Sequence, residues 1–99
     1  MAENTHENSW TFLTNHSHVL LCLAENPSMR MRDIAREVRI TERAVQRIIS
    51  DLVDEGYIEK IREGRSNTYK IHTGMHLRHP IEKEKTIKDL IELVSVAHA

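Results

Sequence analysis

Only three residues, 39–41, separate two segments of this chain whose apolar residues repeat with the period of an α-helix. The first segment covers about residues 31–38, and the second about residues 42–55. Apolar residues of the second segment form one continuous stripe, made of Val45, Ile48, Ile49, Leu52 and Val53. So short a connection makes the two helices pack across each other, which restricts the chain to a few small folds.

The other periodic segments complete one small domain. Asn15 is the predicted N-cap of an earlier helix over about residues 15–25, and Thr41 is the predicted N-cap of the helix that ends before Gly56. The remaining elements are strands at residues 57–63 and 68–72, a turn at residues 64–67, and a last helix over residues 80–98. Pro80, followed by the acids Glu82 and Glu84, is the predicted start of the last helix.

This order predicts a mainly α fold with a β-hairpin wing (α+β), which is a winged helix-turn-helix with a C-terminal helix. We expect one domain over residues 1–99, with residues 1–8 disordered. Apolar residues make up 39% of the chain, and no apolar run reaches the length of a membrane span. A single cysteine excludes an intrachain disulfide, and the polar N-terminus is unlike a secretory signal, so we expect a cytoplasmic protein that does not contact membranes.

Charge is unevenly distributed, although the net charge is only −1. Residues 30–72 hold ten basic and eight acidic side chains, whereas residues 1–29 hold three acids and no Lys or Arg. The basic region coincides with the helix-turn-helix and the hairpin, so the predicted partner is double-stranded DNA. The predicted DNA contacts are Arg32, Arg36, Thr41, Arg43, Gln46, Arg47, Ser50, Arg62, Arg65 and Asn67.

Within this set, the recognition helix at residues 42–55 is expected in the major groove. Arg43, Gln46 and Arg47 are the candidates for base contacts, because recognition helices present their N-terminal residues to base edges. Arg65, at the tip of the wing over residues 57–72, is expected on the DNA backbone or in the minor groove. The alternative is that these charges form an ordinary solvated surface and keep the hairpin edge soluble.

Three runs carry a family resemblance. Residues 33–49 resemble the helix-turn-helix of MarR-like and ArsR-like regulators, and residues 51–58 and 64–69 look like the entry to their wing and its tip. Residues 10–16 and 77–80 resemble a subgroup of very small prokaryotic single-domain regulators. The resemblance covers about residues 9–91 and implies a transcriptional regulator. The chain departs from the family at Arg39, where Gly is usual, so a non-Gly residue must adopt the backbone geometry of the turn.

A homodimer is the expected assembly. The run of residues 19–24 is apolar around the whole first helix, and either an N-terminal cluster of Trp10, Phe12 and Leu13 or a second subunit must cover its outer side. The predicted dimer interface consists of Leu20, Leu21, Ile87, Leu90, Ile91 and Val94. In the alternative interpretation, the last helix folds back on the first helix of its own chain and completes a monomeric core.

Other kinds of function have weaker support. Cys22 and the histidines, among them His72, His76 and His79, do not follow a strong metal-ligand spacing, so neither a metal nor a cofactor is expected. Phosphate loops, nucleophile elbows and paired carboxylates are absent from the sequence, which argues against an enzyme. The competing hypothesis is a winged-helix module that binds protein or RNA without binding DNA. Burial of Arg43 and Arg65 in internal ion pairs would favour it. The sequence does not identify an effector.

Overall fold

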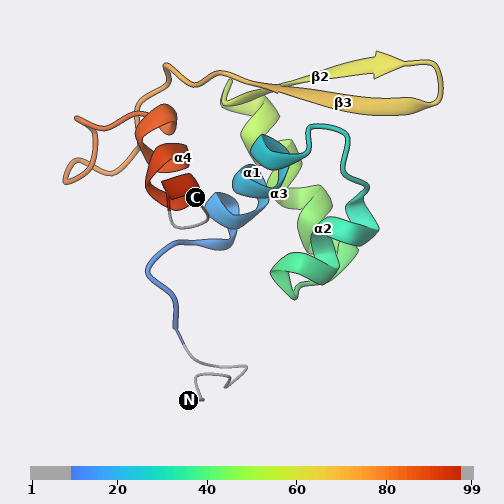
Figure 1. Cartoon of the computed structure of the whole chain (residues 1–99), viewed down its shortest axis with the longest axis horizontal. Coiled ribbons are helices and arrows are strands. Elements are labelled where there is room, and N and C mark those ends of the chain that lie inside the picture. Colours follow the sequence, from blue (N-terminus) through green and yellow to red (C-terminus); the bar gives the residue numbers. More distant parts are fainter. Residues whose placement is uncertain (1–9, 97–99) are drawn as a thin grey trace.

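Residues 10–96 fold as three helices, a β-hairpin and a fourth helix, which confirms the expected order and the winged helix-turn-helix fold (Figure 1). The computed structural model describes residues 10–96, so the expectation for residues 1–8 lies outside the described part. The elements are α1 (Asn15–Glu25), α2 (Met31–Val38), α3 (Glu42–Asp54), β2 (Ile58–Glu63), β3 (Ser66–Ile71) and α4 (Ile87–Val96). No helix in this range is both long enough and apolar enough to cross a membrane.

Threonine side chains cap the starts of α1 and α3. Thr14, rather than Asn15, is the N-cap of α1, and its Oγ1 accepts a hydrogen bond of 3.2 Å from the backbone N–H of Ser17. Thr41 caps α3 as expected, and its Oγ1 accepts a hydrogen bond of 3.0 Å from the backbone N–H of Ala44. Such caps satisfy backbone donors that the first helical turn leaves without partners.

The three-residue turn between α2 and α3 depends on a left-handed backbone at Arg39. Its φ of 69° and ψ of 46° lie in the region that Gly usually occupies. This conformation lets the N–H groups of Arg39 and Ile40 both donate to the carbonyl of Ala35, at 2.7 and 3.1 Å. The turn therefore keeps the geometry for which Gly is favoured, although a residue with a Cβ occupies it.

The turn of the hairpin is tighter than expected. The pairs run from Ile58 opposite Ile71 to Glu63 opposite Ser66, which leaves only Gly64 and Arg65 in the turn. The four-residue turn expected at 64–67 is therefore wrong, because a two-residue turn with Gly64 at φ +61° matches the twist of the strands. The loop between α1 and α2 holds β3 in place, because the carbonyl of Pro27 accepts a hydrogen bond of 3.0 Å from the backbone N–H of Tyr69.

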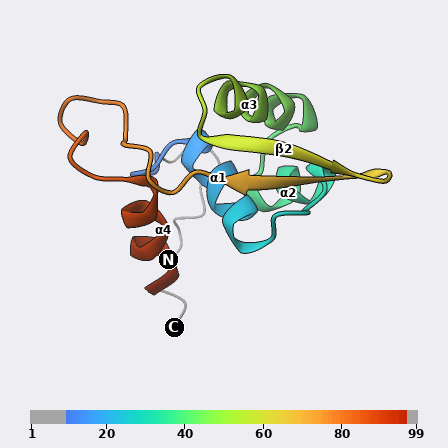
Figure 2. The ribbon, with the colours of Figure 1, turned by 90° about the horizontal axis from the view of Figure 1, so that it is seen from above.

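The hydrophobic core lies where the first three helices meet the base of the hairpin. α3 contributes the apolar stripe that the sequence predicted, and Val45 on it is completely buried. The largest fully buried side chains of the core are Leu20, Leu23, Ile34, Val19 and Val45. Tyr57, Ile58 and Tyr69 close the side of the core next to the hairpin. Figure 2 shows the consequence, a hairpin that extends alongside α3 and well past the helices.

The C-terminal helix starts later than expected. Residues 80–84 form turns, Thr86 forms an isolated antiparallel bridge with His76, and α4 begins at Ile87 rather than near Pro80. The stronger start signal is Thr86, whose Oγ1 accepts a hydrogen bond from the backbone N–H of Asp89. In return, a carboxylate oxygen of Asp89 accepts a hydrogen bond of 2.9 Å from the backbone N–H of Thr86. The hydrogen bonds from Thr86 lower the pKa of Asp89.

Half of the side chains expected in a dimer interface are buried within this chain. Leu20, Ile87 and Leu90 are 2%, 3% and 8% exposed, so they are core residues here. The first turn of α4 thus packs on its own chain. The other three, Leu21, Ile91 and Val94, are half-buried.

The N-terminal aromatic side chains do not cover the outer side of α1. Trp10 and Phe12 are 76% and 91% exposed. They pack edge to face on each other, with ring centroids 4.9 Å apart, rather than on the helix. The outer side of α1 is therefore covered neither by this cluster nor by the first turn of α4.

Replacing the left-handed residue by Gly is expected to stabilise the fold. Arg39→Gly removes the clash of Cβ with the carbonyl, which exceeds the entropy that Gly adds to the unfolded chain, for a net gain of about 0.5–1 kcal/mol in the free energy of unfolding. Chemical denaturation measures this change. Arg39→Ala is the matched control, because it removes the same charge and keeps Cβ. A Gly variant no more stable than the Ala variant would show that the turn is unstrained.

Candidate nucleic-acid interface

The outer face of α3 presents the polar side chains that the sequence singled out. Arg43, Gln46, Arg47 and Ser50 are all exposed, because the apolar stripe on the opposite face fixes the rotation of the helix against the core. Their spacing places them along one side of the helix over two turns. Arg and Gln side chains in this arrangement can donate two hydrogen bonds to a base edge.

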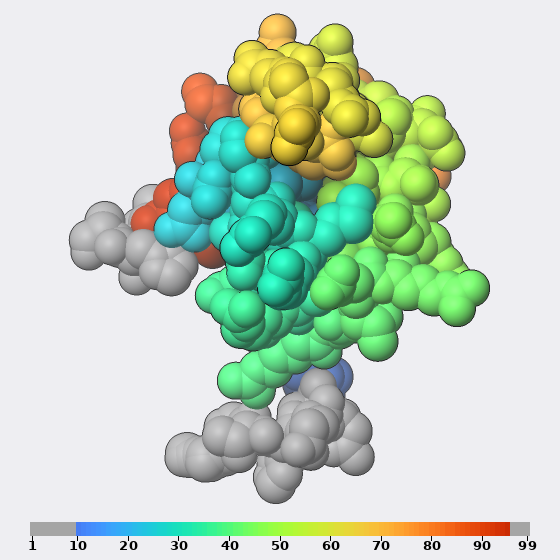
Figure 3. Space-filling model, turned by 90° about the vertical axis from the view of Figure 1, so that its right-hand side faces the viewer, coloured from blue at the N-terminus to red at the C-terminus, as the bar shows by residue number. Residues whose placement is uncertain are grey.

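A hollow of about 650 Å³ separates this face from the hairpin. Arg43, Gln46, Arg47 and Ser50 line it on the α3 side, and Lys60 and Tyr69 line it on the hairpin side. Figure 3 looks onto this side of the molecule, with the hairpin (yellow) at the top and α2 and α3 (blue-green to green) beneath it. The structure therefore brings the predicted recognition helix and the predicted wing together along one concave surface.

Strand alternation divides the charges of the hairpin between its two faces. Lys60 pairs with Tyr69 and Arg62 with Asn67, so these four lie on the face that borders the hollow. The opposite face carries Glu59, Glu63 and Lys70, which the same alternation places away from α3. The face next to α3 is therefore the basic one.

Each predicted wing residue has a distinct setting. Arg65 is exposed at the two-residue turn, where its reach is greatest. Arg62 is also exposed, and its Nε lies 3.4 Å from the carbonyl oxygen of Gly64. Asn67 is half-buried, and its buried Oδ1 has no hydrogen-bond partner in the described structure. Arg62 and Arg65 are thus better placed to contact a partner than Asn67.

The predicted contacts at α2 and its following turn are less available. Arg32 is exposed, but Arg36 lies 3.4 Å from Asp33, which also faces Arg30 at 3.5 Å. These pairs are largely exposed, so they weaken the charge of Arg36 only modestly. The hydroxyl of Thr41 already accepts the capping hydrogen bond of α3, which assigns Thr41 a structural role.

Six residues outside the predicted DNA contacts also line the hollow: Met31, Ile49, Val53, Asp54, Lys60 and Tyr69. Met31 lies at its α2 side, and Lys60 and Tyr69 belong to the hairpin. Counting alternate residues from the buried Ile58 would have placed Lys60 next to α3, so the signal was present in the strand pattern. Tyr69 lines the hollow but is also part of the core, and burial raises its pKa.

Within the described residues, ion pairs do not bury the exposed arginines of the interface. Among residues 10–96, the ion pairs of Lys and Arg involve Arg30, Arg36, Arg78 and Lys88, and none involves Arg43, Arg47 or Arg65. All three side chains are exposed. Burial of Arg43 and Arg65 in ion pairs would have favoured a module without DNA binding, and the described residues do not show it.

The histidines and the cysteine have local structural contacts. His76 Nδ1 lies 2.8 Å from the carbonyl oxygen of Lys83, and His79 Nδ1 accepts from the N–H of Ile81. His72 lies 3.6 Å from Glu59. Cys22 is half-buried, and burial, together with the charges of Glu37 and Glu25, raises its pKa. Within residues 10–96, we find no group of three or more His, Cys, Asp or Glu side chains that could hold a metal ion.

Comparisons with known proteins agree with this geometry. Residues 13–59 match the family model described as winged helix-turn-helix DNA-binding. The crystal structure of the zinc-dependent MarR-family transcriptional regulator AdcR in its Zn(II)-bound state resembles the chain in fold, with a TM-score of 0.54 and 23% sequence identity. The match covers 94% of this chain but only 57% of that regulator. Among proteins with curated functions, none is significantly similar in sequence.

Proposed function

We propose that this chain, a winged helix-turn-helix similar in fold to a MarR-family regulator, is a sequence-specific DNA-binding transcriptional regulator. One observation carries the proposal: the exposed stripe of Arg43, Gln46 and Arg47 adjoins the basic face of the hairpin across an open hollow. The matched family model and the similar structure both belong to DNA-binding proteins rather than enzymes. As a DNA-binding regulator, the protein acts where the DNA is, which in a prokaryotic cell is the cytoplasm.

In this mechanism α3 enters the major groove, whose width accommodates an α-helix. Arg43 and Arg47 offer planar guanidinium groups that donate two parallel hydrogen bonds to a guanine edge, and Gln46 does the same for adenine. Ser50, one turn further along, lies where a shorter hydroxyl contacts the sugar-phosphate backbone. The N-terminal half of α3 thus selects the DNA sequence that is bound, and the rest of the helix positions it on the DNA backbone.

The wing supplies the contacts that do not depend on sequence. Lys60 and Arg62 face the hollow side of the hairpin, so a DNA backbone lying over the hollow passes next to both. Arg65 extends from the turn toward the neighbouring minor groove or phosphate. Neutralising phosphates releases condensed cations, so these contacts make the affinity depend on salt.

The regulator is further proposed to act as a homodimer. A second hollow, of about 440 Å³, lies between α1, α2 and α4, and its apolar lining includes Leu21, Ile91 and Val94. Leu93, on the same helix as Ile91 and Val94, is 67% exposed. A two-fold partner that covers these side chains would place two recognition helices about one DNA turn apart, ~34 Å. The interface proposed here therefore replaces Leu20, Ile87 and Leu90 by Leu93.

Selection of bound duplexes from a random DNA pool tests the function directly. We expect enrichment of one short sequence, repeated as an inverted pair whose centres are one helical turn apart. Enrichment of a single unpaired site would retain DNA binding and contradict the dimer. Absence of any enriched duplex, with binding to RNA or protein instead, would support the competing module and overturn the proposal.

Truncating Arg47 is expected to reduce both affinity and specificity. Arg47→Ala loses a bidentate base contact, which weakens binding to the selected site by about 1–3 kcal/mol and relaxes the preference at one base pair. Fluorescence anisotropy with the selected duplex and single-base variants measures both effects. Lys83→Ala removes the same charge from an exposed position outside the interface, and its affinity should match the wild type. Equal losses in the two variants would remove Arg47 from the base contacts.

Truncating Arg65 is expected to act on all sequences alike. Arg65→Ala loses one phosphate contact, so the slope of log affinity against log salt becomes shallower by about one unit per protomer. A titration of binding over a range of salt concentrations measures the slope. The matched control is Lys70→Ala, which removes a charge from the opposite face of the same hairpin and should leave the slope unchanged. A wild-type slope in the Arg65 variant would exclude this contact.

Charges on the outer face of α4 are expected to separate the protomers. Leu93→Glu combined with Val94→Glu places two carboxylates in the proposed interface without altering the buried Ile87 and Leu90. Sedimentation velocity should show a dimer for the wild type and a folded monomer for the variant, with weaker DNA binding. Thr73→Glu, on an exposed turn, is the control for added charge. A monomeric wild type at micromolar concentrations would contradict the dimer.

A further inference from the structure

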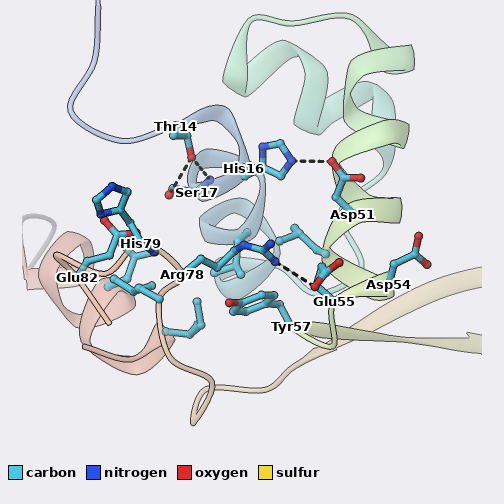
Figure 4. Close-up of a pocket in the computed structure, with 15 residues that line it drawn as sticks. Thr14, His16, Ser17, Asp51, Asp54, Glu55, Tyr57, Arg78, His79 and Glu82 are labelled. Atoms are coloured by element: carbon cyan, nitrogen blue, oxygen red, sulfur yellow. Dashed lines mark hydrogen bonds and ion pairs between the residues drawn. The ribbon is translucent and has the colours of Figure 1, made fainter. Parts of the chain in front are cut away.

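A third hollow lies on the side of α3 away from the hairpin interface. The start of α1, the C-terminal end of α3 and the segment from Leu77 to Leu90 enclose it, with a volume of about 580 Å³ (Figure 4). This volume falls in the range of small-molecule sites in proteins, about 300–1,000 Å³. Neither the DNA contacts nor the proposed dimer interface uses it.

Apolar side chains form the floor of this hollow. Four of them are buried parts of the core or its margin, and a half-buried leucine completes the floor. They are Leu20, Leu52, Leu77, Ile87 and Leu90. The ring of Tyr57 lies beside them, held by a hydrogen bond of 2.9 Å from its hydroxyl to the carbonyl oxygen of His76. The floor is therefore preformed and offers a rigid apolar surface to a ligand.

The rim, in contrast, is polar and predominantly acidic. Asp51, Asp54, Glu55 and Glu82 supply four carboxylates, and Arg78 supplies one permanent cation. Arg78 is already paired with Glu55 at 3.1 Å, and this carboxylate raises its pKa. The remaining three carboxylates make the rim negative.

Both histidines on the rim have contacts of their own. His16 Nε2 lies 2.9 Å from Asp51, so these two side chains interact with each other. Nδ1 of His79 accepts a hydrogen bond of 3.1 Å from the backbone N–H of Ile81. Among residues 10–96, Asp54 and Glu82 do not form ion pairs. Glu82 Oε2 accepts only a long hydrogen bond of 3.5 Å, from the backbone N–H of His79, so both carboxylates can still pair with a cation.

We propose that this hollow binds a small organic cation: an amine or guanidinium on an aryl or alkyl frame. The apolar frame covers the leucine floor, and the cationic group lies at the rim near Asp54 or Glu82. A carboxylate on the same frame would meet net negative charge and would have to displace Glu55 from Arg78. The site stands independently of DNA binding, since all of its parts belong to one protomer.

A series of probes that differ only in charge tests this site. 4-Phenylbutylamine, 4-phenylbutanol and 4-phenylbutyrate share one apolar frame and carry a positive, zero and negative charge. Titrated into the isotopically labelled full chain without DNA, the amine should shift the backbone amide signals of Asp51, Leu77 and Arg78. We expect it to bind about tenfold more tightly than the carboxylate, with the alcohol between them.

Variants of the rim separate the charge effect from the apolar one. Asp54→Asn with Glu82→Gln should reduce the affinity for the amine several-fold and leave the alcohol unchanged. Glu59→Gln with Glu63→Gln, on the hairpin, removes the same charge elsewhere and should have no effect. Equal affinities for amine and carboxylate, or no response to any probe, would overturn the proposal. Lining signals that change only on dilution of the ligand-free protein would assign the hollow to a second copy and also overturn it.

Discussion

Burial of the apolar stripe of α3 is the interaction on which the rest of the structure depends. Val45, Ile48, Ile49 and Leu52 lie against α1, α2 and the base of the hairpin, and each is at most 7% exposed. Burying four such side chains contributes several kcal/mol, roughly 1.5–3 kcal/mol for each. Because this face is fixed in the core, the opposite face with Arg43 and Arg47 is held outward without any further support.

Two hollows then flank the same helix, and they differ in charge. The one toward the hairpin is lined by Arg43, Arg47 and Lys60, and the one toward α4 is rimmed mainly by carboxylates. This separation explains how a chain with a net charge of −1 can offer a basic surface. Asp54 is the exception, since it lines both hollows near the C-terminal end of α3.

Local patterns were sufficient to predict most of the fold. The period of the apolar residues located α2 and α3, a cap residue and an apolar run located α1, and the turn residues at 64–67 marked the hairpin. The start of α4 was wrong because Pro80 fits a first helical turn, whereas the reciprocal hydrogen bonds of Thr86 and Asp89 depend on backbone that only the folded loop brings into place.

Residues that meet across the fold were harder to predict. An apolar stripe on the last helix indicates that something covers it, but the pattern does not distinguish its own chain from a partner. Ile87 and Leu90 therefore belong to the core, although they share a face with Ile91 and Val94. Lys60 was left out of the predicted contacts, because its place beside α3 depends on which face of the hairpin packs against the helix, and only the folded chain shows that Ile58 is buried there.

The three-residue turn at Arg39 has a consequence for how this surface can change. Both N–H groups of Arg39 and Ile40 bond to the carbonyl of Ala35, and the Thr41 cap of α3 follows at once. A turn one residue longer or shorter would lose this spacing between the end of α2 and the cap of α3, and the apolar stripe of α3 would no longer meet α1 and α2 in the same way. The chain can therefore vary the chemistry of its outer face freely, and even accept a strained residue at position 39, while the length of this turn is fixed.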